Sequence, residues 1–298
     1  MNWHKDKTQM WIELISNIQT DYGIDPTQTE KDTIQSMLLS RMNDCPTPFV
    51  FKGGTCLSKG YGIINRFSED IDLSTSEPLT QGQRRHAKEY LISAANELGL
   101  RLLNPEQIRS RRDFNRYVFE YDSLYSDMPE QLIVEISYIS VAYPVNTINI
   151  GSIVGKAYKN FDLSELFPEA NIMMPAQTLE RTFIDKVFAV CDYRLKDRPE
   201  RNSRHLYDIY KLFPAIKRDD SFLELINKVR NERQSSGNCP SSEPDCDISA
   251  LLSKIIKEEF FKNDYNTITL KLLNDNVSYR TAIDGGIRKV AESEFFNV

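Results

Sequence analysis

The spacing of apolar and polar residues predicts most of the elements of this chain. Apolar side chains that return every three or four positions are typical of an amphipathic helix, and a glycine often ends such a run. Short apolar or alternating runs bounded by Gly and Pro are typical of strands. Helices are therefore expected at 5–19, 29–42, 56–63, 84–98, 178–195 and 205–213. Strands are expected at 49–52, 69–74, 116–121 and 131–138, with a further edge strand and turn within 141–159.

The order of these elements predicts an α+β chain, mixed in its first part and helical in its second. We divide it into N-terminal helices at 1–45 that would pack on the core, a core at 46–160, and a helical C-terminal lobe at 161–298. One stretch of the lobe, 231–247, has the sequence NERQSSGNCPSSEPDCD. Because it is polar and rich in Ser, Pro and Gly, we expect a flexible surface loop there.

Composition is that of a globular protein, with 298 residues of which 40% are hydrophobic and 27% charged. No apolar run approaches the roughly 20 residues of a membrane span, and the N-terminal segment has no apolar stretch of the kind found in signal peptides. The five cysteines lack the spacing of a metal site, so free thiols in a reducing compartment are expected. We expect a soluble cytoplasmic protein with no membrane partner.

The net charge of −6 argues against a surface coated throughout with nucleic acid. The charge is uneven, however, because basic residues cluster at 84–88, 109–116 and 194–204. Each cluster is either a solvated helix face or part of a local groove for RNA. The sequence leaves both interpretations open.

Two acids mark the most informative stretch, Phe49–Thr75. Asp70 and Asp72 lie two positions apart on an expected strand, so their side chains project from the same face. Two carboxylates this close repel each other unless a cation lies between them. A hard divalent ion, Mg²⁺ or Mn²⁺, suits such ligands and usually binds together with substrate phosphates.

A glycine turn precedes these acids. Gly53 and Gly54 end one strand and begin a helix, where bare backbone and free N–H groups favour a phosphate. Thr55 adds a hydroxyl, while Lys59 and Arg66 are cations that would meet a polyphosphate. Each feature alone is more often structural, but together they indicate metal-assisted nucleotidyl or phosphoryl transfer.

A third acid would complete such a site from a neighbouring strand. Glu135 interrupts the apolar run LIVEISY, where a charge is costly if it is simply buried. We expect Glu135 to join the metal site and to help deprotonate the attacking hydroxyl. The alternative is a glutamate at a solvated edge position.

The segments GGTCLSK at 53–59 and RFSEDID at 66–72 resemble the motif of the AbiEii/AbiGii toxin family. These nucleotidyltransferases belong to the DNA polymerase β-like superfamily, include relatives of the MenT type, and are toxins of type IV toxin–antitoxin and phage abortive-infection systems. The resemblance implies a small mixed sheet flanked by helices, with a mainly helical C-terminal lobe. It also implies an NTP as co-substrate, an RNA acceptor such as the tRNA 3′ end, growth arrest through blocked translation, and a cognate antitoxin.

The resemblance carries three further residues. Lys186, on the expected helix 178–195, and Asp208, in the run RHLYD, match a lysine and a later aspartate of the family, which implies catalytic roles and places Lys186 at the nucleotide. Ser68 matches the family motif and would bind phosphate. Two rivals remain open: transfer to a small acceptor such as an aminoglycoside, and an inactive binding module with the same fold.

Overall fold

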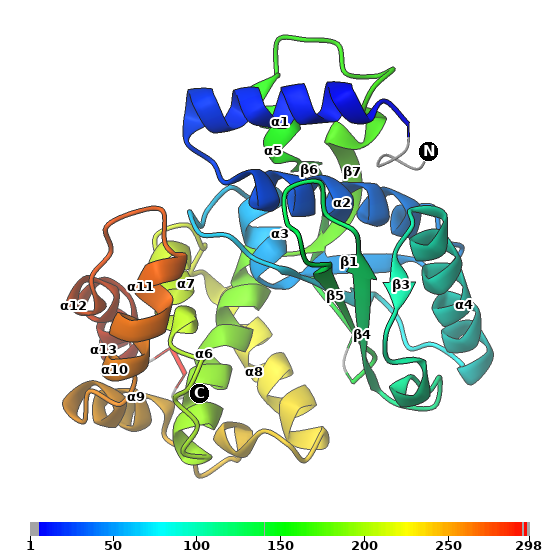
Figure 1. The fold of residues 1–298 in the computed structure, drawn as a ribbon. Coiled ribbons are helices and arrows are strands. Elements are labelled where there is room, and N and C mark those ends of the chain that lie inside the picture. The colour runs from blue at the N-terminus through cyan, green and yellow to red at the C-terminus, as the bar shows by residue number, and fades with distance from the viewer. Residues whose placement is uncertain (1–5, 140, 294, 297–298) are drawn as a thin grey trace. The chain divides into compact units, whose positions relative to one another are not determined.

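The computed structural model describes residues 6–139, 141–293 and 295–296. The chain forms two compact units (Figure 1). Unit 1 comprises Met1–Tyr61 and Ser68–Ala176, and unit 2 comprises Gly62–Phe67 and Gln177–Val298. The borders expected at 45 and 160 both fall inside unit 1. The short segment Gly62–Phe67, which lies between the glycine turn and the acids in sequence, is thus part of unit 2.

Unit 1 is built on a seven-stranded sheet in the order β3-β4-β5-β2-β1-β7-β6. Its strands are β1 Phe49–Lys52, β2 Asp70–Thr75, β3 Arg101–Leu102, β4 Phe114–Tyr121, β5 Glu130–Ser137, β6 Val145–Gly151 and β7 Asn171–Gln177. The sheet is mixed, because β2 runs parallel to β5 and antiparallel to β1, while β4 runs antiparallel to β5. The four strands predicted with definite bounds are confirmed as β1, β2, β4 and β5. The strands β3 and β7 were not predicted.

Five helices accompany this sheet: α1 Thr8–Tyr22, α2 Pro26–Asn43, α3 Gly53–Lys59, α4 Gln81–Glu97 and α5 Ile153–Ala157. Local sequence explains where two of them begin. The carboxylate of Asp25 accepts a hydrogen bond from the Thr27 N–H at the start of α2, and Thr80 forms a capping box with Gln83 at the start of α4. The first residue of the expected helix 5–19 lies outside the described residues, residues 6 and 7 precede the helix, and 8–19 is confirmed as part of α1.

One face of the sheet forms the core of unit 1. Ile71 and Leu73 of β2 are buried against the other strands, together with Leu38 of α2 and Leu91 of α4. In Figure 1, α1 lies above α2, and these two helices pack together. Because side chains alternate along a strand, the residues between the buried ones project from the opposite face. Asp70 and Asp72 are therefore held on the other face by this packing.

Unit 2 is helical apart from short connections. Its main helices are α6 Leu179–Leu195, α7 Arg204–Leu212, α8 Asp220–Ser235 and α9 Ile248–Lys257, followed by the short segments α10 Lys262–Asp264, α11 Leu270–Leu272, α12 Tyr279–Ala282 and α13 Arg288–Ser293. The ring of Phe183 on α6 packs against the rings of Phe213, Phe222 and Phe296. The α+β class is confirmed: a mixed sheet with flanking helices, followed by a helical C-terminal region.

The surface loop expected at 231–247 begins later than predicted, because residues 231–235 are still helical. The helix α8 continues to Ser235, and a short turn follows at Pro240–Ser242. Ser241 is buried, and both its N–H and its hydroxyl donate to the Asp192 carboxylate, at 2.9 and 2.7 Å. Because the polar side chains satisfy one another and a buried acid, a polar composition is compatible here with a packed turn.

No helix in the described part of the chain has both the length and the apolar character needed to cross a membrane.

The core of unit 1 yields a prediction for Leu38, which is fully buried on α2. Replacing it with alanine removes buried apolar surface and leaves a cavity, so Leu38→Ala is expected to lower the free energy of unfolding by about 2–5 kcal/mol. Leu103→Ala is the matched control, because Leu103 is exposed. Urea denaturation followed by circular dichroism measures both. Equal effects of the two substitutions would contradict the packing described here.

Candidate active site

Four charged residues lie in one row across the sheet of unit 1. Asp72 of β2 is paired on one side with Lys52 of β1 and on the other with Glu135 of β5. Glu135 is paired in turn with Arg116 of β4. Residues that face each other on neighbouring strands project from the same face. The row therefore places two carboxylates side by side, with a cation on each flank.

In this row, the two cations reduce the repulsion between the neighbouring carboxylates of Asp72 and Glu135. Like charges directly opposite each other on adjacent strands destabilise a sheet, and here a cation flanks each acid. The guanidinium of Arg116 lies 3.5 Å from the Glu135 carboxylate, and the Glu135 side chain keeps 28% of its surface exposed. Sequence reasoning missed Lys52 and Arg116 as partners. For Lys52 the available signal was its position directly before the two glycines.

The glycine turn lies against the same acids. Gly53 has φ +76°, and a Cβ added there would overlap the Asp72 carboxyl, lying 2.6 Å from its Cγ. The Thr55 hydroxyl is buried and donates to the backbone carbonyl of Asp70. Burial, reinforced by the charge of Asp72, raises the pKa of the adjacent Cys56 thiol. The turn is thus fitted to β2 through backbone and small side chains, and Thr55 holds the two elements together.

Lys59 pairs with Asp32 of α2, which is not part of the row of charged residues. It is buried, and its ammonium donates to the Asp32 carboxylate at 2.5 Å and to the Asp32 carbonyl at 3.1 Å. Burial lowers the pKa of Lys59, and the charge of Asp32 opposes that effect. The second carboxylate oxygen of Asp32 accepts from the Ile153 N–H at 2.7 Å. Lys59 therefore joins α3 to α2 and to the start of α5.

The segment before β2 is also held by a side chain of α2. The amide of Gln35 donates to the carbonyls of Ser68, at 3.3 Å, and Glu69, at 2.9 Å. These bonds fix the backbone that leads into Asp70. Ser68 itself is half-buried.

In unit 2, Arg66 and Lys186 meet at Asp208. The guanidinium of Arg66 forms two hydrogen bonds to the Asp208 carboxylate, at 2.9 and 2.8 Å. The ammonium of Lys186 donates to the same carboxylate at 2.7 Å. Asp208 is fully buried, and the two cations keep only 5% and 7% of their surface exposed. The structure thus brings together three of the residues that the sequence singled out.

The electrostatics of this cluster keep Asp208 ionised and leave an excess of positive charge. Burial alone would raise the pKa of Asp208, but Arg66 and Lys186 outweigh it and hold that pKa well below its usual range. Burial and the charge of Lys186 keep the pKa of the neighbouring His205 well below its usual range, so this ring is neutral. Two cations and one carboxylate leave the cluster with a net charge of about +1 near neutral pH.

The segment Gly62–Phe67 reaches this cluster because α7 holds its backbone. The Asn65 N–H donates to the hydroxyl of Tyr207 at 2.9 Å, and the Asn65 carbonyl accepts from the Asn274 N–H at 2.9 Å. Tyr207 donates in turn to Asp275 at 3.1 Å. Arg66 is therefore anchored through both its side chain and its neighbouring backbone.

The donor set of unit 1 suits a hard divalent ion. Asp70 and Asp72 share one face of β2, Glu135 is next to Asp72, and the missing Cβ of Gly53 leaves space at the Asp72 carboxyl. Carboxylate oxygens are the ligands that Mg²⁺ and Mn²⁺ prefer. Within the described residues, no group of three or more His, Cys, Asp or Glu side chains lies close enough together to hold a metal ion, so the structure does not gather the three predicted ligands Asp70, Asp72 and Glu135 into one set.

The Asp208 cluster yields a prediction about stability. Asp208→Asn leaves two buried cations without their counter-charge, so it is expected to lower the free energy of unfolding by about 3–5 kcal/mol at neutral pH. The folded-state pKa of Asp208 lies below its ordinary value of 3.8. The stability from its charge is therefore complete above that value and is lost as the pH falls further, so the penalty should shrink in acid.

Urea unfolding at about pH 7 and about pH 3 tests this dependence. Glu258→Gln is the control, because Glu258 pairs with Arg194 at 2.7 Å in a partly exposed bridge, where a loss of at most about 1 kcal/mol is expected. A penalty for Asp208→Asn that is no larger than that of the control would refute the assignment.

Comparisons with known proteins bear on this fold and site. The model of the family described as nucleotidyl transferase AbiEii toxin, type IV TA system, matches residues 38–284. No curated protein matches the chain. Among solved structures, the chain is similar to MenT4, a nucleotidyltransferase toxin from Mycobacterium tuberculosis H37Rv, with 15% identity, a TM-score of 0.57, and 96% of this chain and 89% of MenT4 covered. It is also similar to an H. pylori protein described as a nucleotidyltransferase, with 20% identity, a TM-score of 0.51, and 92% and 96% covered.

At these identities the likeness to solved structures shows the fold, and it confirms the α+β architecture that the resemblance implied. The family model covers most of the chain, including the glycine turn, the acids of β2 and β5, and the cluster at Asp208. The chain therefore belongs to the AbiEii family of nucleotidyltransferase toxins of type IV toxin–antitoxin systems, which implies an NTP as substrate and an antitoxin as partner.

Proposed function

We propose that this toxin transfers a nucleoside monophosphate from an NTP to the 3′-terminal hydroxyl of tRNA in a metal-dependent reaction that blocks translation and growth. The observation that carries the proposal is the pairing of Asp72 with Glu135 beside the glycine turn. A metal could bind at the two side-by-side carboxylates, and a phosphate could bind next to it at the bare backbone of the glycine turn. A binding module would gain nothing from acids held this close.

In this proposal Asp70 and Asp72 hold Mg²⁺ or Mn²⁺, and Glu135 completes the set of acids. The bound ion would neutralise charge on the phosphate oxygens and on the leaving pyrophosphate. Glu135 would take the proton of the attacking hydroxyl as that oxygen bonds to the α-phosphate. Arg116 and Lys52 would keep the two acids of the row charged and side by side.

Two groups of residues would receive the phosphates. The backbone of Gly53 and Gly54 would accept a phosphate at close range because neither has a Cβ. Lys186 would neutralise charge on the departing pyrophosphate, with Asp208 fixing the direction of its ammonium. The Ser68 hydroxyl would add a hydrogen bond to phosphate.

Three of the expected nucleotide ligands receive positioning roles instead. Lys59 is held by Asp32, so we assign it to fixing α3. Thr55 donates its hydroxyl to the Asp70 carbonyl and fixes the turn to β2. Arg66 binds Asp208 through two hydrogen bonds and places its own segment. Each acts on the nucleotide through the backbone or side chain that it holds.

Removing one charge from the acid pair tests the transfer chemistry. A metal contributes several kcal/mol of charge stabilisation, and about 1.4 kcal/mol is a factor of ten, so Asp70→Asn and Asp72→Asn should each slow transfer at least about a hundredfold. Asp122→Asn is the control, since the Asp122 side chain is 85% exposed. Metal-dependent labelling of total tRNA by each of four radiolabelled NTPs measures the rate. Wild-type labelling by either variant would sink the assignment.

The same labelling panel identifies the acceptor. Label on the 3′ end of tRNA supports the proposal, and mapping with a nuclease that releases the terminal nucleotide locates it. Label that appears on aminoglycosides and not on RNA would replace the proposed acceptor with a cationic small molecule. The charge of −6 is the observation that makes this rival worth including.

The glycine turn yields a separate prediction. Gly53→Ala places a methyl group against the Asp72 carboxyl and should reduce transfer at least about tenfold, since small displacements of a catalytic group are costly. Gly23→Ala is the control for backbone strain alone. Gly23 has a similar φ of +67°, but nothing lies within 4 Å of a Cβ added there. Labelling assays and melting temperatures measure both. If Gly23→Ala impairs transfer as much as Gly53→Ala, the close approach to Asp72 is not the cause.

A further inference from the structure

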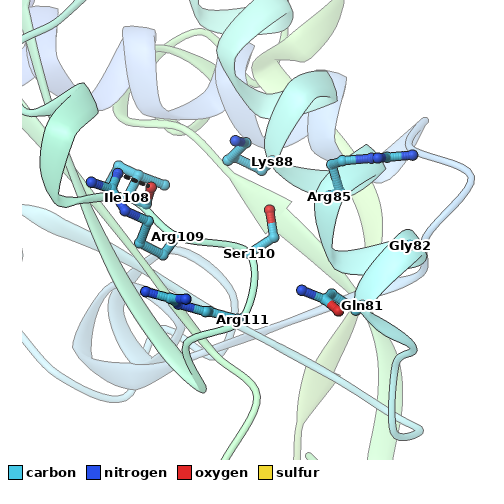
Figure 2. Close-up of a pocket in the computed structure, with 8 residues that line it drawn as sticks. All are labelled: Gln81, Gly82, Arg85, Lys88, Ile108, Arg109, Ser110 and Arg111. Atoms are coloured by element: carbon cyan, nitrogen blue, oxygen red, sulfur yellow. Dashed lines mark hydrogen bonds between the residues drawn. The ribbon is translucent and has the colours of Figure 1, made fainter.

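Two basic clusters that are separate in sequence line one pocket of unit 1. Arg85 and Lys88 come from the first turns of α4, while Arg109, Ser110 and Arg111 come from the loop before β4. The pocket has a volume of about 670 Å³. In Figure 2, Ser110 lies between the side chains of α4 and those of Arg109 and Arg111. The fold thus brings together four cations that the sequence left as two possible solvated faces.

Buried groups fix the basic loop beneath its exposed cations. The side chain of Asn115 is buried, accepts from the Arg109 N–H at 2.9 Å, and donates to the Arg109 carbonyl at 3.1 Å. Ile108 is buried and is the large apolar residue of the lining. The loop backbone is therefore anchored, and its cations extend from a supported frame that loses little freedom when a ligand binds.

A second contact joins the loop to α4. Arg84 donates to the Asp113 carboxylate at 2.8 Å, and its guanidinium lies over the Tyr138 ring at 4.8 Å. This bridge ties α4 to the loop and pairs the Asp113 charge with Arg84, and neither residue is part of the lining. Of the lining cations, Arg85 approaches a carboxylate, that of Glu89 at 4.0 Å, and both of these side chains are exposed. The four lining cations thus exceed the acid beside them, and the pocket is positively charged.

We propose that this pocket binds the sugar–phosphate backbone of the RNA acceptor, an inference that rests on the proposed transfer to RNA. Four cations around a cavity of this size suit several phosphates on a flexible strand better than one small anion. Phe114 follows the loop and leaves 43% of its surface exposed, which offers an aromatic face for a base. Neither Asp72 nor Glu135 lines the pocket. The pocket would therefore bind a part of the RNA strand other than the 3′ end that reacts.

The test measures RNA binding without turnover. A fluorescently labelled RNA hairpin with a single-stranded 3′ end is titrated with the full chain in the absence of NTP, over a series of salt concentrations. Each lost contact to a single-stranded phosphate reduces the magnitude of the slope of log K against log salt by about 0.7, which is roughly fivefold in affinity near about 0.1 M salt. Arg85→Ala/Arg111→Ala is therefore expected to reduce the magnitude of the slope by about 1.4 and to weaken binding roughly tenfold to a hundredfold.

A matched control removes the same charge elsewhere. Lys217→Ala/Lys271→Ala takes two exposed cations from unit 2, and its RNA affinity should remain close to that of wild type. Lys88→Ala/Arg109→Ala is a second pocket variant, so that a folding defect in one variant does not decide the result. Both pocket variants must keep the wild-type melting temperature to be scored. The inference would be overturned if a folded pocket variant had the same RNA affinity and the same salt slope as the Lys217→Ala/Lys271→Ala control.

Two further readouts separate the explanations. Vesicles of phosphatidylglycerol and phosphatidylcholine replace the RNA in a parallel titration. If the pocket variants lose vesicle binding and keep RNA binding, the pocket serves a membrane surface and the inference is wrong. Labelling assays are read independently of binding. If wild-type protein labels a small acceptor but does not bind RNA, the inference is overturned and the transfer chemistry stands. If RNA binding depends on the pocket but no acceptor is labelled, the inference is supported and the proposed transfer is contradicted.

Discussion

The side-by-side placement of Asp72 and Glu135 on neighbouring parallel strands is the constraint on which the rest of this site depends. Two carboxylates in register repel each other, and the surrounding residues compensate for that repulsion. Arg116 pairs with one acid, Lys52 is next to the other in the sheet, and Gly53 leaves space where a side chain would collide. Without a cation between them, the repulsion of Asp72 and Glu135 makes the sheet less stable than it would be with a neutral residue at one of these positions.

The neighbouring elements are fixed by contacts that never touch the acids. Asp32 on α2 holds Lys59 of the glycine helix and caps the first turn of α5. Gln35, one turn further along α2, holds the backbone that leads into β2. The buried face of α2 therefore does more than fill the core, because it sets where the glycine turn ends and where the acidic strand begins.

Unit 2 shows the same principle with opposite charge. Asp208 is fully buried, yet it keeps Arg66 and Lys186 in place through three charged hydrogen bonds. Removing one partner from such a cluster is costly because the others remain buried. The cluster explains why the segment Gly62–Phe67 belongs to unit 2 although it connects two elements of unit 1. It also keeps the ammonium of Lys186 in one fixed position.

Local pattern was sufficient to predict the main strands, the glycine turn and the acid pair, because each depends on spacing within a few residues. It could not reveal that Lys59 is buried against Asp32, since that contact joins residues 27 positions apart. Nor could it show that Ser241 is packed against the helical region, because its partner Asp192 lies on another helix. The strand β7 was missed for the same kind of reason: Phe51 of β1 pairs with Ala176, which is distant in sequence.

In the proposed reaction, the acids of β2 bind a divalent ion together with a nucleotide. Titration of Mn²⁺ in the presence of a non-hydrolysable NTP analogue, followed by electron paramagnetic resonance, tests this directly on wild type and on Asp72→Asn. Wild type should bind Mn²⁺ in a nucleotide-dependent manner, and the variant should lose this binding. Equal Mn²⁺ binding by the two proteins, with or without nucleotide, would contradict it.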